Sequence, residues 1–145
     1  MQYTYDGPRE SVVVMRRFDA PLERVFDAWI DPATAEKWLF TTKTSTAVYE
    51  LDVRAGGSYT ITRRRGGKEY VGVGEYLQVD RPRRLVFTFA MPQFAADYDN
   101  IAVDIEPDED GSLLTLTHSG LRPGYEKSTV KGWEKMFDAL AKALA

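Results

Sequence analysis

The sequence predicts an α+β domain in which a curved antiparallel sheet of about seven strands carries a long C-terminal helix on one face. Its last stretch, Ser128 to Ala145, has the apolar spacing of three and four that is typical of an amphipathic helix. The residues of this apolar stripe are Val130, Trp133, Phe137, Leu140 and Leu144. Most of the preceding chain alternates apolar and polar residues with period two and is broken by tight-turn signals, which indicates antiparallel strands. The helix is therefore expected to cover the apolar face of the sheet.

Length and composition indicate one domain over residues 1–145. A chain of 145 residues, 43% hydrophobic and 28% charged, is long enough to bury a core and is typical of a globular protein. The absence of cysteine excludes disulfides and thiolate metal sites. With a net charge of −3 and no long apolar run, we expect no nucleic-acid binding, no membrane insertion and a cytoplasmic location.

The N-terminal third predicts one strand and two short helices. The β-branched run in Glu10 to Phe18 favours a strand, and apolar residues on both of its sides predict burial on both faces. A helix is expected to begin at Ala20-Pro21, because proline suits a first helical turn. Asp31 is the expected N-cap of a second short helix that begins at Pro32.

Six further strands follow, each separated from the next by turn residues. They are expected at Val48–Val53, Ser58–Arg65, Glu69–Val79, Leu85–Met91, Ile101–Glu106 and Leu114–His118. Gly66-Gly67 is the signal of a two-residue hairpin. Gly72 and Gly74 interrupt one strand, which predicts a bulge, a bend or close packing of another backbone. The pattern leaves open which parity faces inward from Val71 to Tyr76.

Two further features concern the final helix. Gly132 lies inside it at a cost of roughly 1 kcal/mol relative to alanine, and a close approach to a strand or to a bound molecule would explain this glycine. A strongly curved sheet wrapped around one helix also encloses more volume than the helix fills. Other side chains or a ligand are expected to fill the remaining space.

Five segments in order carry a family resemblance: FDAPLERVFDAWIDPATAEKWL, ELDVRAGGSYTI, VGVGEYLQVDRPRRLVFTF, LLTLTHSGL and GWEKMFDAL. From Val12 to Leu144 the chain resembles the SRPBCC superfamily, which has the START-like helix-grip fold. It looks most like the single-domain bacterial homologues of the activator of the ninety-kilodalton heat-shock chaperone's ATPase. The resemblance implies a helix-grip: a seven-stranded curved antiparallel sheet, two short helices after the first strand, and a long C-terminal helix across the concave face.

The resemblance also implies a ligand cavity between the sheet and the long helix. The residues expected to line it are Trp38, Phe40, Tyr59, Ile61, Phe87, Phe89, Val103, Leu116, His118, Trp133 and Phe137. Most of them also fall on the covered parity of the period-two pattern. The family often has a second tryptophan after Trp38, where this chain has Leu39, which alters one wall of the cavity.

The preferred hypothesis is a non-catalytic binder of a small hydrophobic or aromatic molecule, with Tyr59 and His118 orienting a polar end. One alternative is an enzyme like the polyketide cyclases and aromatases of this fold, in which Tyr59, Arg63 or His118 handles protons. The other is a stress-response module that interacts with the chaperone. Phe94 and exposed strand edges offer apolar contacts for a homodimer.

No catalytic residue is assigned. His118 is the only histidine, and its sequence neighbourhood offers no partner, so a hydrogen-bonded place in the cavity wall is preferred over the role of general base. No cofactor and no metal is expected, because the chain is short of the usual ligands.

Overall fold

The computed structural model describes residues 7–40, 46–92 and 97–145. In chain order its elements are β1 (Glu10–Phe18), α1 (Leu22–Ile30), α2 (Pro32–Ala35), β2 (Thr46–Leu51), β3 (Ser58–Arg65), β4 (Lys68–Asp80), β5 (Arg84–Phe89), β6 (Asp99–Asp108), β7 (Gly111–Leu121) and α3 (Glu126–Leu144). The predicted order of one strand, two short helices, six strands and one long helix is confirmed. Within the described ranges, no helix is long and apolar enough to span a membrane.

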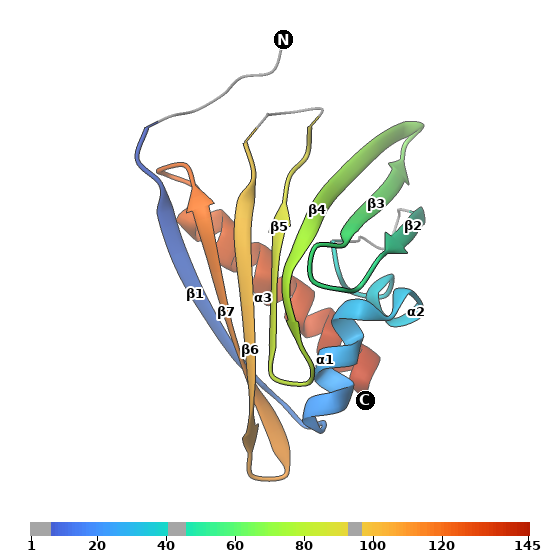
Figure 1. Ribbon diagram of the computed structural model, residues 1–145, viewed down its shortest axis with the longest axis vertical. Helices are drawn as coiled ribbons and strands as arrows, with labels where there is room; N and C mark the ends of the chain where they lie inside the picture. The colour runs from blue at the N-terminus through green and yellow to red at the C-terminus, as the bar shows by residue number, and fades with distance from the viewer. Residues whose placement is uncertain (1–6, 41–45, 93–96) are drawn as a thin grey trace.

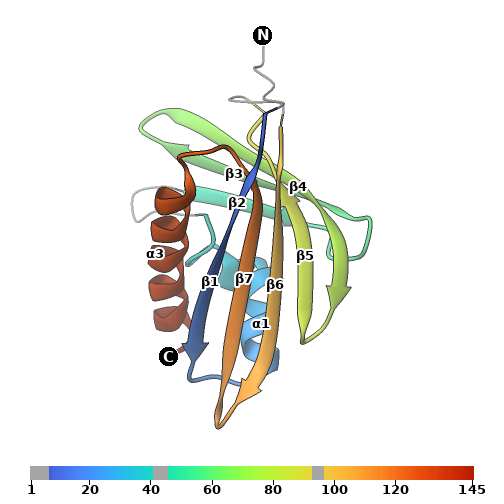
Figure 2. The same cartoon turned by 90° about the vertical axis from the view of Figure 1, so that its left-hand side faces the viewer.

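The seven strands form one antiparallel sheet in the order β1-β7-β6-β5-β4-β3-β2. A register shift between Tyr76 and Gln78 in β4 marks an irregularity of the kind that bends a strand. Figure 1 shows α3 crossing the sheet, and α1 and α2 lie near the C-terminal end of α3. Figure 2 shows β2 and β3 crossing the direction of β1, β7 and β6, so that the sheet curls around the helices. The α+β helix-grip expectation is therefore confirmed.

Aromatic side chains fill the space between the sheet and the helices. From α3, Trp133 and Phe137 are buried, with ring centroids 5.8 Å apart. From α1, Trp29 lies 5.8 Å from Trp133 and 4.6 Å from Trp38, centroid to centroid. The interior at this level is a packed aromatic core.

Strand β1 departs from the expectation that both of its faces are buried. Val14 and Phe18 are buried, but Val13 and Met15 are each 59% exposed. The expectation was wrong because α3 packs on one face of β1 only. Among the described residues, no helix covers the opposite face of the sheet.

Both glycines of β4 are sites of close packing: a backbone lies against Gly74, which is one of the expected alternatives, and a side chain lies against Gly72. A Cβ atom on Gly72 would lie 2.8 Å from Cε1 of Phe89. A Cβ atom on Gly74 would lie 2.0 Å from the carbonyl oxygen of Thr88 and 2.4 Å from the ring of Tyr59. The structure also settles the parity that the pattern left open: Gly72 and Gly74 lie against aromatic rings of the covered face.

The helix ends differ from expectation in detail. Helix α3 begins at Glu126, two residues before the predicted start. A Cβ atom on Gly132 would meet nothing within 4 Å, so the expected close approach of a strand is wrong. Asp31 is at the N-cap of α2, but its carboxylate accepts a hydrogen bond from the Thr34 hydroxyl (2.8 Å) and caps no backbone N–H.

Candidate functional site

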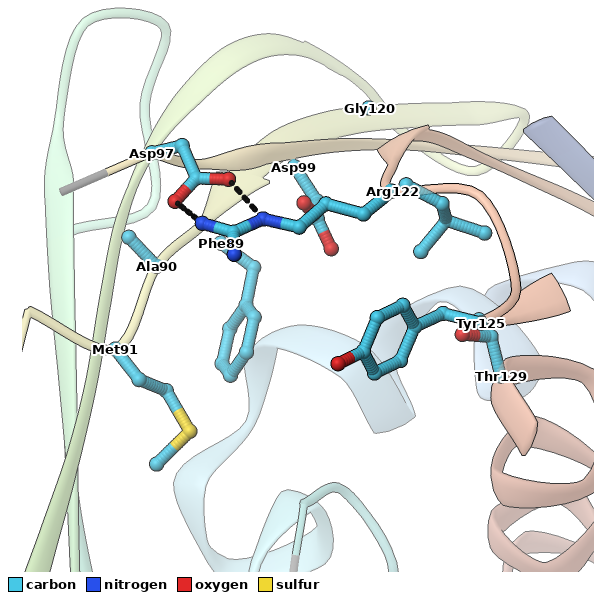
Figure 3. Close-up of a pocket in the computed structure, with 10 residues that line it drawn as sticks. Phe89, Ala90, Met91, Asp97, Asp99, Gly120, Arg122, Tyr125 and Thr129 are labelled. Atoms are coloured by element: carbon cyan, nitrogen blue, oxygen red, sulfur yellow. Dashed lines mark hydrogen bonds and ion pairs between the residues drawn. The ribbon is translucent and has the colours of Figure 1, made fainter. Parts of the chain in front are cut away.

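An open pocket of about 380 Å³ lies between the end of β5, the start of β6 and the connection from β7 to α3 (Figure 3). We call it the rim pocket. The residues that line it are Phe89, Ala90, Met91, Asp97, Asp99, Gly120, Leu121, Arg122, Tyr125 and Thr129. Figure 3 shows the side chains of Phe89, Met91 and Tyr125 around one common space, with Asp97 and Arg122 above it. Apolar walls with a few polar groups at one end are typical of small-molecule sites.

The polar end of the rim pocket is built around the carboxylate of Asp97. Arg9 donates to Asp97 Oδ2 from Nη1 at 2.8 Å, and Arg122 donates to Oδ1 from Nη2 at 2.9 Å. These hydrogen bonds from Arg9 and Arg122 lower the pKa of Asp97 to about 2. The ionised carboxylate therefore joins the chain before β1 to the two connections that form the pocket.

A second polar network rises from the core to Asp99. The indole Nε1–H of Trp133 donates to Nδ1 of His118 at 2.9 Å, and Nε2 of His118 lies 2.7 Å from Oδ2 of Asp99. An indole N–H can only donate, so Nδ1 of His118 accepts and the ring proton is assigned to Nε2, which donates to Asp99. His118 is 6% exposed. With both ring nitrogens engaged, the imidazole positions Asp99.

Sequence reasoning did not identify Asp97, Asp99 or Arg122. One signal for Asp99 was present, because it lies two residues before Ile101, whose cross-strand partner is His118. Extending the period-two pattern of β6 by one step places Asp99 on the same face of the sheet as His118. Asp97 and Arg122 lie in connections between elements, where no periodic pattern indicates that they pair.

A much smaller space, which we call the inner cavity, lies deeper between the sheet and the helices. Its volume is about 10 Å³, and it is lined by Trp29, Leu39, Phe40, Leu51, Tyr59, Ile61, Tyr76, Leu85 and Phe87. The rings of Phe40 and Phe89 stack with centroids 4.5 Å apart. Since Phe89 lines the rim pocket and Phe40 the inner cavity, this stacked pair lies between the two spaces.

The tyrosine hydroxyl expected to orient a ligand is engaged within the protein. Tyr59 donates to the carbonyl oxygen of Thr88 at 2.5 Å. Burial raises the pKa of Tyr59 far above its ordinary value, so the hydroxyl keeps its proton at any physiological pH. Arg63, the other polar candidate on this strand, belongs to neither lining.

The structure distributes the eleven predicted lining residues over four places. Phe89 lines the rim pocket, and the inner cavity is lined by Phe40, Tyr59, Ile61 and Phe87. His118 and Trp133 form the hydrogen-bonded network that reaches Asp99. The remaining four are buried in the core outside both linings: Trp38, Val103, Leu116 and Phe137.

Two other expectations concern contacts and metals. Phe94, expected to offer an apolar contact for a homodimer, lies outside the described residues. Within the part of the chain that the structure describes, no three histidine, aspartate or glutamate side chains gather in a way that could hold a metal ion.

Comparison with known proteins gives a family and a set of similar folds. The family model described as "Activator of Hsp90 ATPase homolog 1-like protein" matches residues 19–145. Among solved structures, protein CV1439 from Chromobacterium violaceum is 24% identical, with a TM-score of 0.83 over 92% of this chain and 96% of that one. The protein of unknown function SA2116 from Staphylococcus aureus is 23% identical, with a TM-score of 0.83 over 94% of each chain.

A third similar structure is an AHSA1-like protein from Aeromonas hydrophila, 18% identical, with a TM-score of 0.78 over 92% of this chain and 91% of that one. At these identities the likeness shows the fold alone. No curated protein matches the chain.

Proposed function

This chain belongs to the Activator of Hsp90 ATPase homolog 1-like family, and we propose that it binds a small, mainly apolar or aromatic molecule in the rim pocket. The observation that carries the proposal is the pocket itself. Its volume of about 380 Å³ is within the range of small-molecule sites, and its walls combine apolar side chains with a few polar groups.

The lining indicates how such a ligand would lie. Phe89, Met91 and Tyr125 offer apolar and aromatic surface to the body of the ligand. Asp99, held by His118, and the hydroxyl of Thr129 offer hydrogen bonds to a polar group. The two carboxylates of the lining are balanced by Arg122, which also lines the pocket, and by Arg9, which pairs with Asp97, so the pocket favours a neutral ligand.

The polar contacts favour binding over catalysis of the cyclase or aromatase kind. Such an enzyme needs a side chain that is free to move a proton at the ligand. Both ring nitrogens of His118 are engaged by Trp133 and Asp99, and the hydroxyl proton of Tyr59 is directed at a backbone carbonyl. An interaction with the chaperone, a homodimer and a cytoplasmic location stay predictions.

A fluorescent probe tests the proposal. N-phenyl-1-naphthylamine is neutral and aromatic, and its emission increases in apolar surroundings. We expect the wild-type protein to bind it saturably, and we expect Thr129→Phe, which fills the rim pocket from α3, to weaken the affinity at least about tenfold, or roughly 1.4 kcal/mol. Lys127→Phe is the matched control, because Lys127 is exposed on the same helix and lies outside the lining.

The control variant should bind the probe as the wild type does. The proposal fails if the wild type shows no saturable emission, or if Thr129→Phe and Lys127→Phe bind equally well. Either result would mean that the rim pocket is not the binding site for apolar molecules.

A further inference from the structure

The hydrogen bonds among Trp133, His118 and Asp99 run in one direction, from the core to the rim pocket. The indole of Trp133 can only donate, so Nδ1 of His118 accepts and Nε2 of His118 donates to Oδ2 of Asp99. Trp133 is 1% exposed and His118 6% exposed, whereas the side chain of Asp99 is 27% exposed and lines the pocket. Asp99 is therefore the member of this chain that a ligand in the pocket can reach, and it faces the ligand as an acceptor.

The carboxylate of Asp99 keeps one oxygen for a ligand. His118 occupies Oδ2, and Oδ1 has no hydrogen-bond partner among the residues that the structure describes. Figure 3 shows this carboxylate directed toward the space between the rings of Phe89 and Tyr125. A Cβ atom on Gly120 would lie 3.6 Å from Oδ1 of Asp99, so glycine at this position keeps a neighbouring side chain from covering that oxygen.

The other carboxylate of the pocket is engaged on both of its oxygens. Arg122 donates to Oδ1 of Asp97 at 2.9 Å, and Arg9 donates to Oδ2 at 2.8 Å. A ligand donor therefore meets Asp99 in preference to Asp97. Because the two guanidinium groups balance the charge of the two carboxylates, the donor need not be a cation. A phenolic hydroxyl is a neutral donor, and its ring suits the aromatic walls.

We propose that Asp99 selects the ligand of the rim pocket, and that this ligand is a neutral aromatic compound with a hydroxyl group. The hydroxyl donates to Oδ1 of Asp99 while the ring lies between Phe89 and Tyr125. His118 and Trp133 are positioning residues that hold the carboxylate from the core side. This inference rests on the proposed function for the place of binding, and it adds the chemical class of the ligand.

A matched pair of probes tests the hydrogen bond. 2-Naphthol and 2-fluoronaphthalene have the same rings and nearly the same size, but only the first has an O–H donor. We expect calorimetry to show that the wild-type protein binds 2-naphthol about tenfold more tightly at pH 7, because a hydrogen bond to a carboxylate is charge-assisted. Without an acceptor, the hydroxyl would lose its hydration on entry, and 2-naphthol would have no advantage.

Two variants on β6 test the role of Asp99. Asp99→Ala removes the acceptor and should abolish the preference for 2-naphthol, while 2-fluoronaphthalene still binds. Asp104→Ala is the matched control, because Asp104 lies on the same strand but on its opposite face and outside the lining. This control variant should keep the tenfold preference.

The wild-type protein supplies a readout that does not depend on any variant remaining folded. His118 is the only histidine, so its Nε2–H gives one imidazole signal in a ¹H–¹⁵N spectrum. A phenol bound to Oδ1 shares the Asp99 carboxylate with His118 and weakens the hydrogen bond from Nε2–H. Saturation with 2-naphthol should therefore place this proton upfield of its position at saturation with 2-fluoronaphthalene, whose rings have nearly the same effect on the signal.

Three results would overturn this inference: equal affinities of the wild type for the two naphthalenes, a preference that survives Asp99→Ala or is lost in Asp104→Ala, and the same His118 signal with both probes at saturation. If N-phenyl-1-naphthylamine binds saturably while 2-naphthol has no advantage over 2-fluoronaphthalene, only this inference fails. If neither the fluorescent probe nor either naphthalene binds, the proposed function fails with it.

Discussion

At the scale of single residues, most polar groups in the aromatic core already have hydrogen-bond partners within the protein. Both ring nitrogens of His118 have partners within the protein, because an indole donor lies on one side and a carboxylate on the other. Ser112 shows the ordinary case of a satisfied core polar group, since its hydroxyl donates to the carbonyl oxygen of Ala20 at 2.6 Å. The indole N–H of Trp29, by contrast, is buried without a hydrogen-bond partner among the residues that the structure describes.

One prediction at this scale concerns Gly132. A Cβ atom there meets open space and the backbone is helical, so Gly132→Ala should raise the free energy of unfolding by about 0.5–1 kcal/mol. Urea denaturation measures the change. Gly124→Ala is the matched control: its Cβ atom also meets open space, but its φ of 96° strains an alanine, so this variant should be less stable than the parent. A destabilised Gly132→Ala would contradict the helix packing described above.

At the scale of elements, β4 is shaped by the aromatic side chains that lie across it. Its partner β5 carries Phe87 and Phe89, and β3 carries Tyr59. The strand accommodates the rings of Phe89 and Tyr59 by having glycine at positions 72 and 74. Gly72 thus leaves room for Phe89, one ring of the stacked pair between the rim pocket and the inner cavity.

Gly74→Ala tests this account of β4. The added methyl group would lie 2.0 Å from a backbone carbonyl oxygen, which cannot move without separating β4 from β5. We expect the free energy of unfolding to fall by about 1–3 kcal/mol, the usual cost of overpacking. Gly132→Ala introduces the same methyl group without a neighbour and should show the opposite sign. A stability equal to that of the parent would mean that the strand has more room than the structure indicates.

At the scale of the whole molecule, ion pairs join segments that are distant in the chain. Asp97 connects Arg9, before β1, with Arg122, after β7. Arg81 joins the turn between β4 and β5 to Asp27 on α1 through two hydrogen bonds of 2.8 Å. Arg16 of β1 pairs with Asp138 of α3 at 2.7 Å. Each pair bridges the sheet to another layer or connection, and the Asp97 pairs also build the polar end of the rim pocket.

The Asp97 pairs predict a pH dependence of stability. The pKa of Asp97 falls from 3.8 to about 2 in the folded protein, so the carboxylate stabilises the fold fully above pH 3.8 and loses this effect as the pH falls through about 2. Asp97→Asn should therefore be less stable than the wild type at pH 7, by about 1 kcal/mol for a partly exposed group. The difference should shrink as the pH falls from about 4 and vanish below the folded-state pKa of about 2, and urea denaturation at a series of pH values measures it.

Asp138→Asn is the control for this experiment. Asp138 makes an ion pair but is 66% exposed, so its replacement should change the stability little at any pH. A pH-independent difference between Asp97→Asn and the wild type would show that the carboxylate acts through its shape and not through its charge.

The order and type of the elements could be predicted from local pattern alone, because they depend on short-range chemistry. The spacing of Trp133, Phe137 and the other apolar residues predicted α3, and the glycine pair at 66 and 67 predicted a hairpin whose two residues have φ values of 59° and 78°. The family resemblance added the arrangement of these elements, which is the helix-grip fold. Period-two parity also placed His118 on the covered face before its partners were known.

The remaining space and the pairing of polar groups depend on contacts between segments that are distant in the chain. Whether a chamber is filled depends on the volumes of side chains from α1, α3 and the sheet, and here Trp29 of α1 packs against both Trp38 and Phe137. The rim pocket is formed where chain connections meet, and the partners Arg9 and Asp97 are 88 residues apart. Periodicity indicates on which face of a strand or helix a side chain lies, but not which residue of another element contacts it. These contacts could therefore not be predicted from local pattern.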